Sequence, residues 1–147
     1  MPPVVERDVV FAKIASIDRC LRRIAEVRQP GRGLQPVDVE DLVELNLQRA
    51  VQAAIDLAAH VVATEGFGIP GKLAETFTLL EREGIVSPDL AERLRRMTGF
   101  RNIAVHEYDE MDPRVVAAIV EHHLDDLREL ARTILARFRL DAGAAGT

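Results

Sequence analysis

Apolar residues recur at helical spacing through most of the chain. Between residues 4 and 28 they fall three or four positions apart, and this stripe consists of Val10, Ile14, Ile17, Leu21 and Ile24. Such spacing places the side chains on one face of a helix, so we expect a first helix here. Prolines and glycines then predict a loop: Pro30, Gly31, Gly33 and Pro36.

A second and broader apolar face runs from about residue 37 to residue 64, which predicts a long second helix. It is rich in alanine, which permits neighbouring helices to approach closely: Ala50, Ala53, Ala54, Ala58 and Ala59. Asp38 is a candidate N-terminal cap for this helix. Asn46, Arg49 and His60 lie beside or within the apolar face, and we interpret each as a polar group satisfied at a helix junction.

Three further helices follow, over residues 73–82, from residue 88 into the segment 99–108, and from residue 113 to about 139. Ser87 and Asp112 are candidate caps, and each is followed directly by a proline at the first helical position. His122 and His123 lack further ligands at a suitable spacing, so we interpret them as structural or interfacial and not as metal ligands.

No segment shows the two-residue alternation of a strand. The pattern as a whole predicts an all-α protein, an antiparallel bundle of four to five helices with short connections. A length of 147 residues suits one domain, which we place at residues 1–140, with a flexible tail over residues 141–147.

The composition narrows the class of protein. A net charge of −5 argues against a protein that coats nucleic acid by bulk attraction, although a local basic site stays open. The chain shows neither the apolar core of a signal peptide nor a run of the roughly 18 apolar residues that a membrane span needs, so we expect a cytoplasmic protein without membrane association. The single Cys20 excludes an internal disulfide and a cysteine metal cage, and we interpret it as buried filler.

Residues 99–108 contain chemistry that a packing helix does not need, because they hold an Arg, an Asn, a His and the only Tyr. The inward stripe of the fourth helix passes through Leu94 and Met97 and continues to Arg101. An arginine at such a position is rarely left without an anion, because desolvating an unpaired charge costs several kcal/mol. Arg101 therefore either forms a buried ion pair with a carboxylate of the bundle, or lies in a groove that takes an anionic ligand such as phosphate.

Asn102 and His106 are four residues apart and share a helix face, which lies roughly 100–140° from Arg101 on an ideal helix. Either the helix loosens near His106, or two copies of the motif complete one site across a two-fold axis. Gly99 permits close backbone approach there, at a cost of about 1 kcal/mol relative to alanine.

The same helix carries a basic patch, because the segment 91–101 holds Arg93, Arg95, Arg96 and Arg101 against a single carboxylate, Glu92. Taken alone, Arg93 is best interpreted as part of a solvated basic face. Together the arginines predict a local positive field in an acidic protein, and Arg95 and Arg96 are candidate RNA contacts.

The residues Arg101, His106 and Tyr108 match the pattern Arg-x4-His-x-Tyr, within the longer segments 84–86 and 94–109. These segments resemble the signature of HEPN-domain proteins, and specifically of HepT-like toxins from bacterial and archaeal toxin–antitoxin pairs. The order of helices is also similar, so the resemblance covers most of the chain. It implies a helical bundle that dimerises so that two motifs line a shared cleft.

The resemblance implies that Arg101 and His106 are the catalytic pair of an endoribonuclease, with Asn102 as a supporting polar residue. The chemistry is plausible, because RNA carries its own nucleophile in the 2′-hydroxyl. His106 is of a type that exchanges protons near neutral pH, and Arg101 can hold a phosphate in a bidentate, charge-assisted way. Such a nuclease requires no metal ligands and no cofactor.

The resemblance gives Tyr108 a separate role, as the acceptor of AMP groups from an MntA-type minimal nucleotidyltransferase antitoxin. Phosphates added beside Arg101 would occupy the anion site and block RNA. From position alone, Tyr108 is more simply a ring packed at a helix end with its hydroxyl in water.

Two alternatives to a toxin endoribonuclease stay open. The chain is alternatively a non-catalytic HEPN module whose cleft binds a nucleotide or docks a nucleotidyltransferase. It is alternatively a purely structural helical dimer in which Arg101 forms a buried ion pair.

Overall fold

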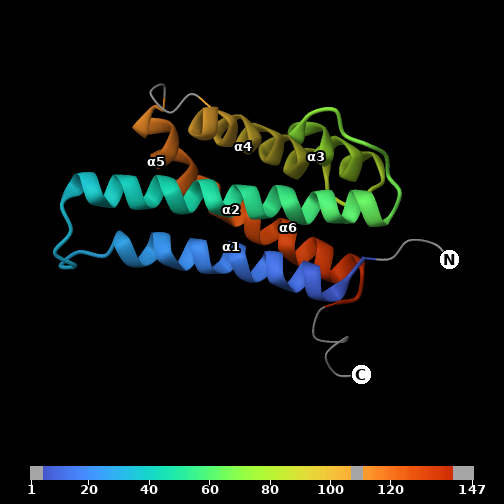
Figure 1. The fold of residues 1–147 in the computed structure, drawn as a ribbon, viewed down its shortest axis with the longest axis horizontal. Coiled ribbons are helices and arrows are strands. Elements are labelled where there is room, and N and C mark those ends of the chain that lie inside the picture. Colours follow the sequence, from blue (N-terminus) through green and yellow to red (C-terminus); the bar gives the residue numbers. More distant parts are fainter. Residues whose placement is uncertain (1–4, 107–110, 141–147) are drawn as a thin grey trace.

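The computed structural model describes residues 5–106 and 111–140, and all of the regular secondary structure within them is helical (Figure 1). Six helices follow one another along the chain: α1 (Arg7–Val27), α2 (Pro36–Thr64), α3 (Leu73–Arg82), α4 (Pro88–His106), α5 (Pro113–His122) and α6 (Leu124–Arg137). The prediction of an all-α protein is confirmed. The prediction of four to five helices is wrong, because the segment expected to form one last helix, from residue 113 to about 139, forms two helices, α5 and α6.

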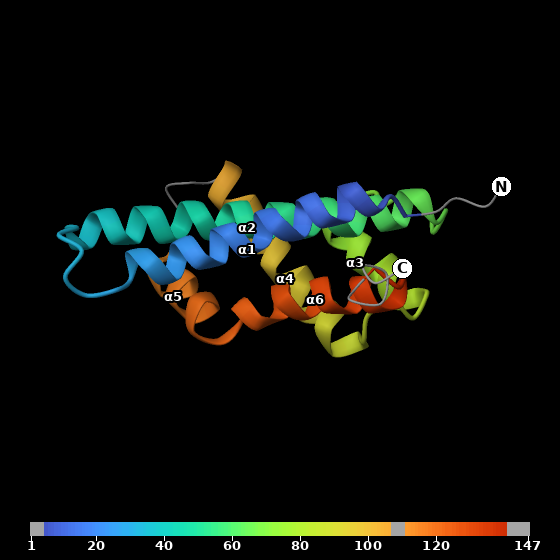
Figure 2. The ribbon, with the colours of Figure 1, turned by 90° about the horizontal axis from the view of Figure 1, so that it is seen from below.

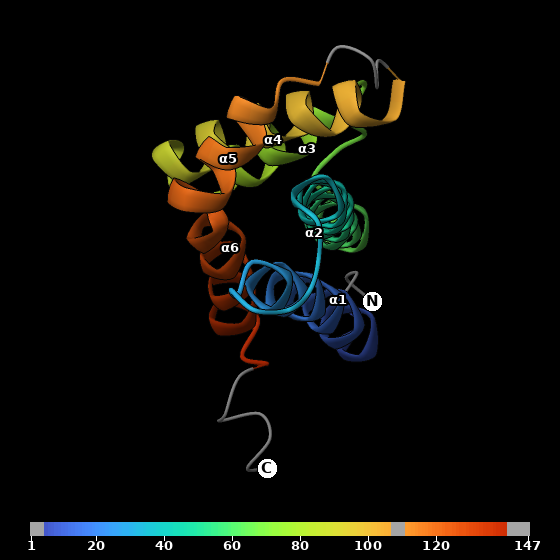
Figure 3. The same cartoon turned by 90° about the vertical axis from the view of Figure 1, so that its left-hand side faces the viewer.

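Helix α2 occupies the middle of the molecule. It has α1 on one side and α3, α4 and α5 on the other, while α6 closes a third side (Figure 3). Figure 2 shows that α6 runs along the pair formed by α1 and α2. With 29 residues, α2 is about 43 Å long, and it contacts each of the other five helices.

The pairing of α1 with α2 follows from the two apolar stripes. Ile17, Leu21 and Ile24 of α1 are buried, and α2 buries its alanines and branched residues against them. The alanines include Ala50, Ala54 and Ala58, which are almost completely inaccessible. Gly31 and Gly33 adopt positive φ angles in the connecting loop, which other residues rarely do.

The helix ends agree with two of the three predicted caps. Ser87 Oγ accepts the Leu90 backbone N–H at 3.2 Å, and Asp112 Oδ1 accepts the Arg114 N–H at 2.9 Å. The third prediction is wrong, because α2 begins at Pro36 with Gln35 as its cap. Asp38 is instead the third helical residue, and its carboxylate accepts the Gln35 backbone N–H at 3.3 Å.

The break between α5 and α6 lies at His123, whose φ of −128° and ψ of 1° are not helical. Asp126 in the first turn of α6 stabilises it, because its carboxylate contacts His123 Nδ1 at 3.2 Å and accepts from Arg93 Nε on α4 at 2.9 Å. The chain therefore turns here and α6 crosses behind α1 and α2 (Figure 1). His123 is structural, as expected, while His122 is exposed.

Of the three polar residues of α2 that were predicted to be satisfied at helix junctions, Asn46 and His60 have hydrogen-bond partners. Asn46 donates to the Leu42 carbonyl at 2.8 Å, and His60 Nε2 accepts the backbone N–H of Glu6, the residue preceding α1, at 3.0 Å. Cys20 is buried as expected, and burial raises the pKa of its thiol. Arg49 differs, because its side chain is exposed.

The predicted tail at residues 141–147 lies outside the described residues. Within the described ranges, none of the helices combines the length and apolar character that crossing a membrane requires.

Replacing Ser87 by alanine should lower the free energy of unfolding by about 1 kcal/mol and the Tm by about 3 °C, because the Leu90 N–H loses its acceptor. Urea unfolding followed by circular dichroism measures this. Ser87→Asp keeps an acceptor oxygen and serves as the control, so equal destabilisation of both variants would contradict the capping role.

Candidate active site

Helix α4 carries the motif against the middle of α2. Leu94, Met97, Phe100 and Ala104 are buried and fix the orientation of the helix. Arg101 lies on the same side but is only half-buried. Its Nε donates to Gln52 Oε1 on α2 at 2.7 Å, so the guanidinium lies where α4 meets α2. The inward position expected for Arg101 is confirmed.

The partners of Arg101 are neutral amides. Besides Gln52, its Nη1 donates to Asn102 Oδ1 at 3.1 Å. Over residues 5–106 and 111–140, no carboxylate forms an ion pair with Arg101, so the buried ion pair of the structural alternative is not found there. Amide oxygens orient the guanidinium without neutralising its charge, which leaves it suited to an anionic ligand.

The contact with Asn102 corrects the separation of faces expected from an ideal helix. An ideal helix separates the Cβ directions of neighbouring residues by about 100°, but the long arginine side chain bends back to reach its neighbour. Asn102 therefore belongs with Arg101 as much as with His106. Both Asn102 and His106 are exposed.

Helix α4 continues without interruption to His106. Of the two explanations offered for the separation of Arg101 and His106, loosening of the helix is therefore excluded up to this residue. That one site is composed from two copies stays a prediction.

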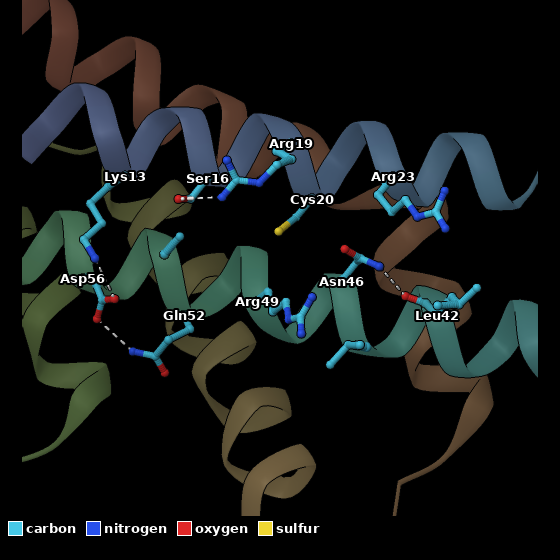
Figure 4. Close-up of a pocket in the computed structure, with 12 residues that line it drawn as sticks. Lys13, Ser16, Arg19, Cys20, Arg23, Leu42, Asn46, Arg49, Gln52 and Asp56 are labelled. Atoms are coloured by element: carbon cyan, nitrogen blue, oxygen red, sulfur yellow. Dashed lines mark hydrogen bonds and ion pairs between the residues drawn. The ribbon is translucent and has the colours of Figure 1, made fainter.

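The candidate site contains a polar chain that the sequence analysis missed. Gln52 accepts from Arg101, and its amide Nε2 donates to Asp56 Oδ1 at 2.9 Å, while Asp56 Oδ2 pairs with Lys13 Nζ on α1 at 3.4 Å (Figure 4). Gln52 and Asp56 are four residues apart and interrupt the most apolar part of the chain. That interruption is the signal that could have identified them.

The arginines expected to contact RNA are engaged elsewhere. Arg95 Nη1 pairs with Glu81 of α3 at 2.9 Å, and Arg96 Nη2 pairs with Glu92 of its own helix at 3.0 Å. Arg96 is 76% exposed, which leaves its pair weak, whereas the Arg95 pair is about two-thirds buried and joins two helices. The structure does not bring either side chain to Arg101.

Arg93 is not part of a solvated basic face, contrary to the expectation. Its Nε donates to Asp126, whose side chain is only 10% exposed, and its Nη2 lies 3.7 Å from Glu129. The patch expected on α4 is therefore largely neutralised by carboxylates, with Arg101 as the exception within the described ranges.

Gly99 is exposed on α4, and a Cβ added there would meet no atom within 4 Å. Nothing in the described part of the protomer requires glycine at this position, although glycine costs a helix about 1 kcal/mol relative to alanine. Tyr108, the expected AMP acceptor, lies outside the described residues. Among the described residues, no group of three His, Cys, Asp or Glu side chains is arranged to hold a metal ion.

The family model described as Ribonuclease HepT-like matches residues 17–134 of this chain. The chain belongs to the HepT-like ribonuclease family, and the resemblance inferred from the motif is confirmed.

Two curated relatives are nucleases. The mRNA nuclease HepT of Shewanella oneidensis is 39% identical over 130 residues, which cover 88% of this chain and 98% of the relative. The tRNA nuclease HepT of Aphanizomenon flos-aquae is 33% identical over 93 residues, or 63% of each chain. A solved structure of the tri-AMPylated Shewanella oneidensis HEPN toxin in complex with the MNT antitoxin has a TM-score of 0.80, with 39% identity over 88% of this chain and 98% of that one.

Replacing Gln52 by leucine should lower kcat/KM for RNA cleavage by roughly tenfold. Leucine is of similar size but has no oxygen to accept the hydrogen bond from Arg101. Gln52→Glu places a carboxylate against both Arg101 and Asp56, which neutralises the guanidinium and removes the donor to Asp56, so it should not restore the activity. Cleavage of a fluorescent RNA measures both.

The matched control is Gln48→Leu, one turn earlier on α2 and without a side-chain hydrogen bond in the described residues. Equal loss in Gln48→Leu and Gln52→Leu, or no loss in Gln52→Leu, would mean that Gln52 does not position Arg101.

Proposed function

We propose that this chain is the toxin of a toxin–antitoxin pair and an endoribonuclease that cleaves RNA without a metal ion or cofactor. The observation that carries the proposal is the guanidinium of Arg101, half-buried and held by the amides of Gln52 and Asn102 in a chain of the HepT-like family. An arginine oriented by neutral groups retains its charge for a phosphate.

The reaction that fits these residues is a transesterification within RNA. The 2′-hydroxyl gives its proton to the imidazole of His106 as its oxygen attacks the adjacent phosphorus. The bond from phosphorus to the 5′-oxygen breaks, and that oxygen takes up a proton from water as it leaves. The products are a 2′,3′-cyclic phosphate and a 5′-hydroxyl. Arg101 stabilises the negative charge that builds on the phosphoryl oxygens, and Asn102 supports the guanidinium.

The proposed active form is a homodimer in which two α4 helices approach each other. Three observations support it: α4 is continuous to His106, Asn102 and His106 are exposed, and Gly99 has open space beside it. In such a dimer Arg101 of one protomer and the imidazole from its partner face one phosphate.

Replacing Arg101 or His106 by alanine should reduce cleavage of RNA by at least 100-fold, and cleavage by the unsubstituted chain should persist in excess EDTA. Arg132→Ala, an exposed substitution on α6, is the matched control and should cut normally. Cleavage that survives either site substitution would contradict the assignment. RNA or nucleotide binding without any cleavage would favour the non-catalytic HEPN module.

The composite site has its own readout. Mixing the Arg101→Ala and His106→Ala chains should restore up to about a quarter of the activity, since half of the dimers are mixed and each has one intact site. No recovery on mixing would indicate that the site lies within one protomer.

We further propose that an MntA-type nucleotidyltransferase antitoxin neutralises this chain by AMPylation of Tyr108. The oxygen of the tyrosine attacks the α-phosphate of ATP, and pyrophosphate leaves. Support comes from the relative solved as a tri-AMPylated toxin with its antitoxin, and from the position of Tyr108 two residues after His106. The added phosphates carry negative charge to the vicinity of Arg101 and compete with RNA.

Co-expression with the nucleotidyltransferase should increase the intact mass of the chain by one or more AMP groups and suppress RNA cleavage. Tyr108→Phe should show neither the mass increase nor the suppression, because it lacks the accepting oxygen. A mass increase that persists in Tyr108→Phe would place the modification on another residue.

A further inference from the structure

A cavity of about 630 Å³ lies between α1 and α2, beside the polar chain that leads to Arg101 (Figure 4). Lys13, Arg19 and Arg23 come from α1, and Arg49 comes from α2. These four cations share the lining with one carboxylate, that of Asp56. The protein as a whole carries a net charge of −5, so the cavity has the opposite sign to the molecule around it.

The four cations differ in how far they are neutralised. Lys13 pairs with Asp56 at 3.4 Å, and Arg23 pairs with Glu26 at 3.3 Å in an exposed pair that contributes little. Arg19 has only the Ser16 hydroxyl as a partner, at 3.4 Å, and Arg49 forms no ion pair within residues 5–106 and 111–140. Two exposed guanidinium groups therefore face solvent at the cavity without a carboxylate in the described structure.

Three of the four cations form a row along α1, and the fourth, Arg49, lies on α2. The α1 residues of the cavity recur every three or four positions from Lys13 to Arg23, which spans about 15 Å along the helix. The α2 residues recur in the same way from Asn46 to Asp56. An elongated polyanion with regularly spaced charges fits a row of cations on α1 with a further cation on α2 better than a small compact anion does.

Gln52 connects this cavity with the candidate active site. Its side chain lines the cavity, and the same side chain accepts the hydrogen bond from Arg101 Nε at 2.7 Å. A strand whose scissile phosphate contacts Arg101 therefore has the basic cavity directly beside it. The arginines of α4 do not provide such a path, because Arg93, Arg95 and Arg96 are each paired with carboxylates.

We propose that the cavity between α1 and α2 is a phosphate-binding subsite that holds the backbone of the RNA next to the scissile bond. Arg19 and Arg49 contact the phosphates, and Lys13 and Arg23 add to the field. Contacts of this kind position RNA without reading its sequence. The subsite rests on the proposed ribonuclease function, which it extends by assigning the residues that bind the flanking backbone.

The test compares two double variants that each remove two positive charges, on an His106→Ala background that does not cut RNA. Arg19→Gln/Arg49→Gln removes charge from the cavity. Arg22→Gln/Arg132→Gln removes the same charge from exposed positions that do not line it. Fluorescence anisotropy with a labelled single-stranded RNA at several salt concentrations gives the affinity of each variant, and circular dichroism confirms that each is folded.

The cavity variant should bind RNA about tenfold more weakly than its background, and its slope of log K against log salt should be smaller in magnitude by about 1.4, since about 0.7 is lost for each phosphate contact. The control variant should keep the affinity and slope of the background. Equal effects of the two variants would overturn the subsite and leave only an effect of total charge.

Sedimentation of both double variants tests whether a second copy of the chain, and not RNA, occupies the cavity. If the cavity variant alone changes its oligomeric state, a second copy of the chain occupies the cavity and the proposal fails. Cleavage by the unsubstituted chain is measured in parallel. A chain that neither binds nor cuts RNA would overturn the ribonuclease function together with the subsite, whereas cleavage with indistinguishable double variants would overturn the subsite alone.

Discussion

The burial of α2 on several sides is the constraint on which the rest of the structure depends. A helix enclosed by α1, α3, α4 and α6 must be apolar around much of its circumference, and its alanines allow the neighbours to approach. Any polar side chain in this helix needs a partner, because burying it without one costs free energy. Gln52 and Asp56 meet that need through Arg101 and Lys13, so the demands of packing and the geometry of the candidate site are satisfied by the same hydrogen bonds.

The electrostatics of the molecule follow from how its arginines are paired. Those of α4 that face α3, α5 and α6 are joined to carboxylates and stabilise the bundle, as Arg95 with Glu81 and Arg93 with Asp126 illustrate. Arg101, by contrast, meets amide oxygens, and Arg49 faces solvent. Positive charge is therefore retained on two neighbours of α2, at the cavity beside α1 and at Arg101 of α4, in a protein whose total charge is negative.

The sequence predicted the helices and the motif well, because both depend on local spacing. Three- and four-residue intervals placed Arg101 on the packed side of α4, and proline after Ser87 and Asp112 marked two helix starts. Contacts between distant segments were not predictable in this way. The bond from Arg101 to Gln52 joins residues 49 positions apart, and the pair of Arg93 with Asp126 spans 33. Both require knowledge of which helices pack together.

The break at His123 was hidden for a different reason. Val116 and Val120 of α5 and Leu127, Leu130 and Ile134 of α6 are all buried, and their spacing continues across the break as though one helix were present. Two successive helices that face the same core give the same pattern as a single long one. Only the local contacts of Asp126 with His123 and Arg93 distinguish the two cases, and these are tertiary.

In the proposed dimer, Gly99 would link the amount of this protein to its stability and activity. An exposed glycine in a helix lowers the folding stability of the isolated protomer. A partner helix that packs closely against the glycine would offset this loss of stability. If the active form is a dimer, folding stability and activity then both rise with the concentration of the chain by mass action. In the proposed dimer the chain would thus be least stable and least active while it is scarce, and little RNA would be cut below a certain abundance.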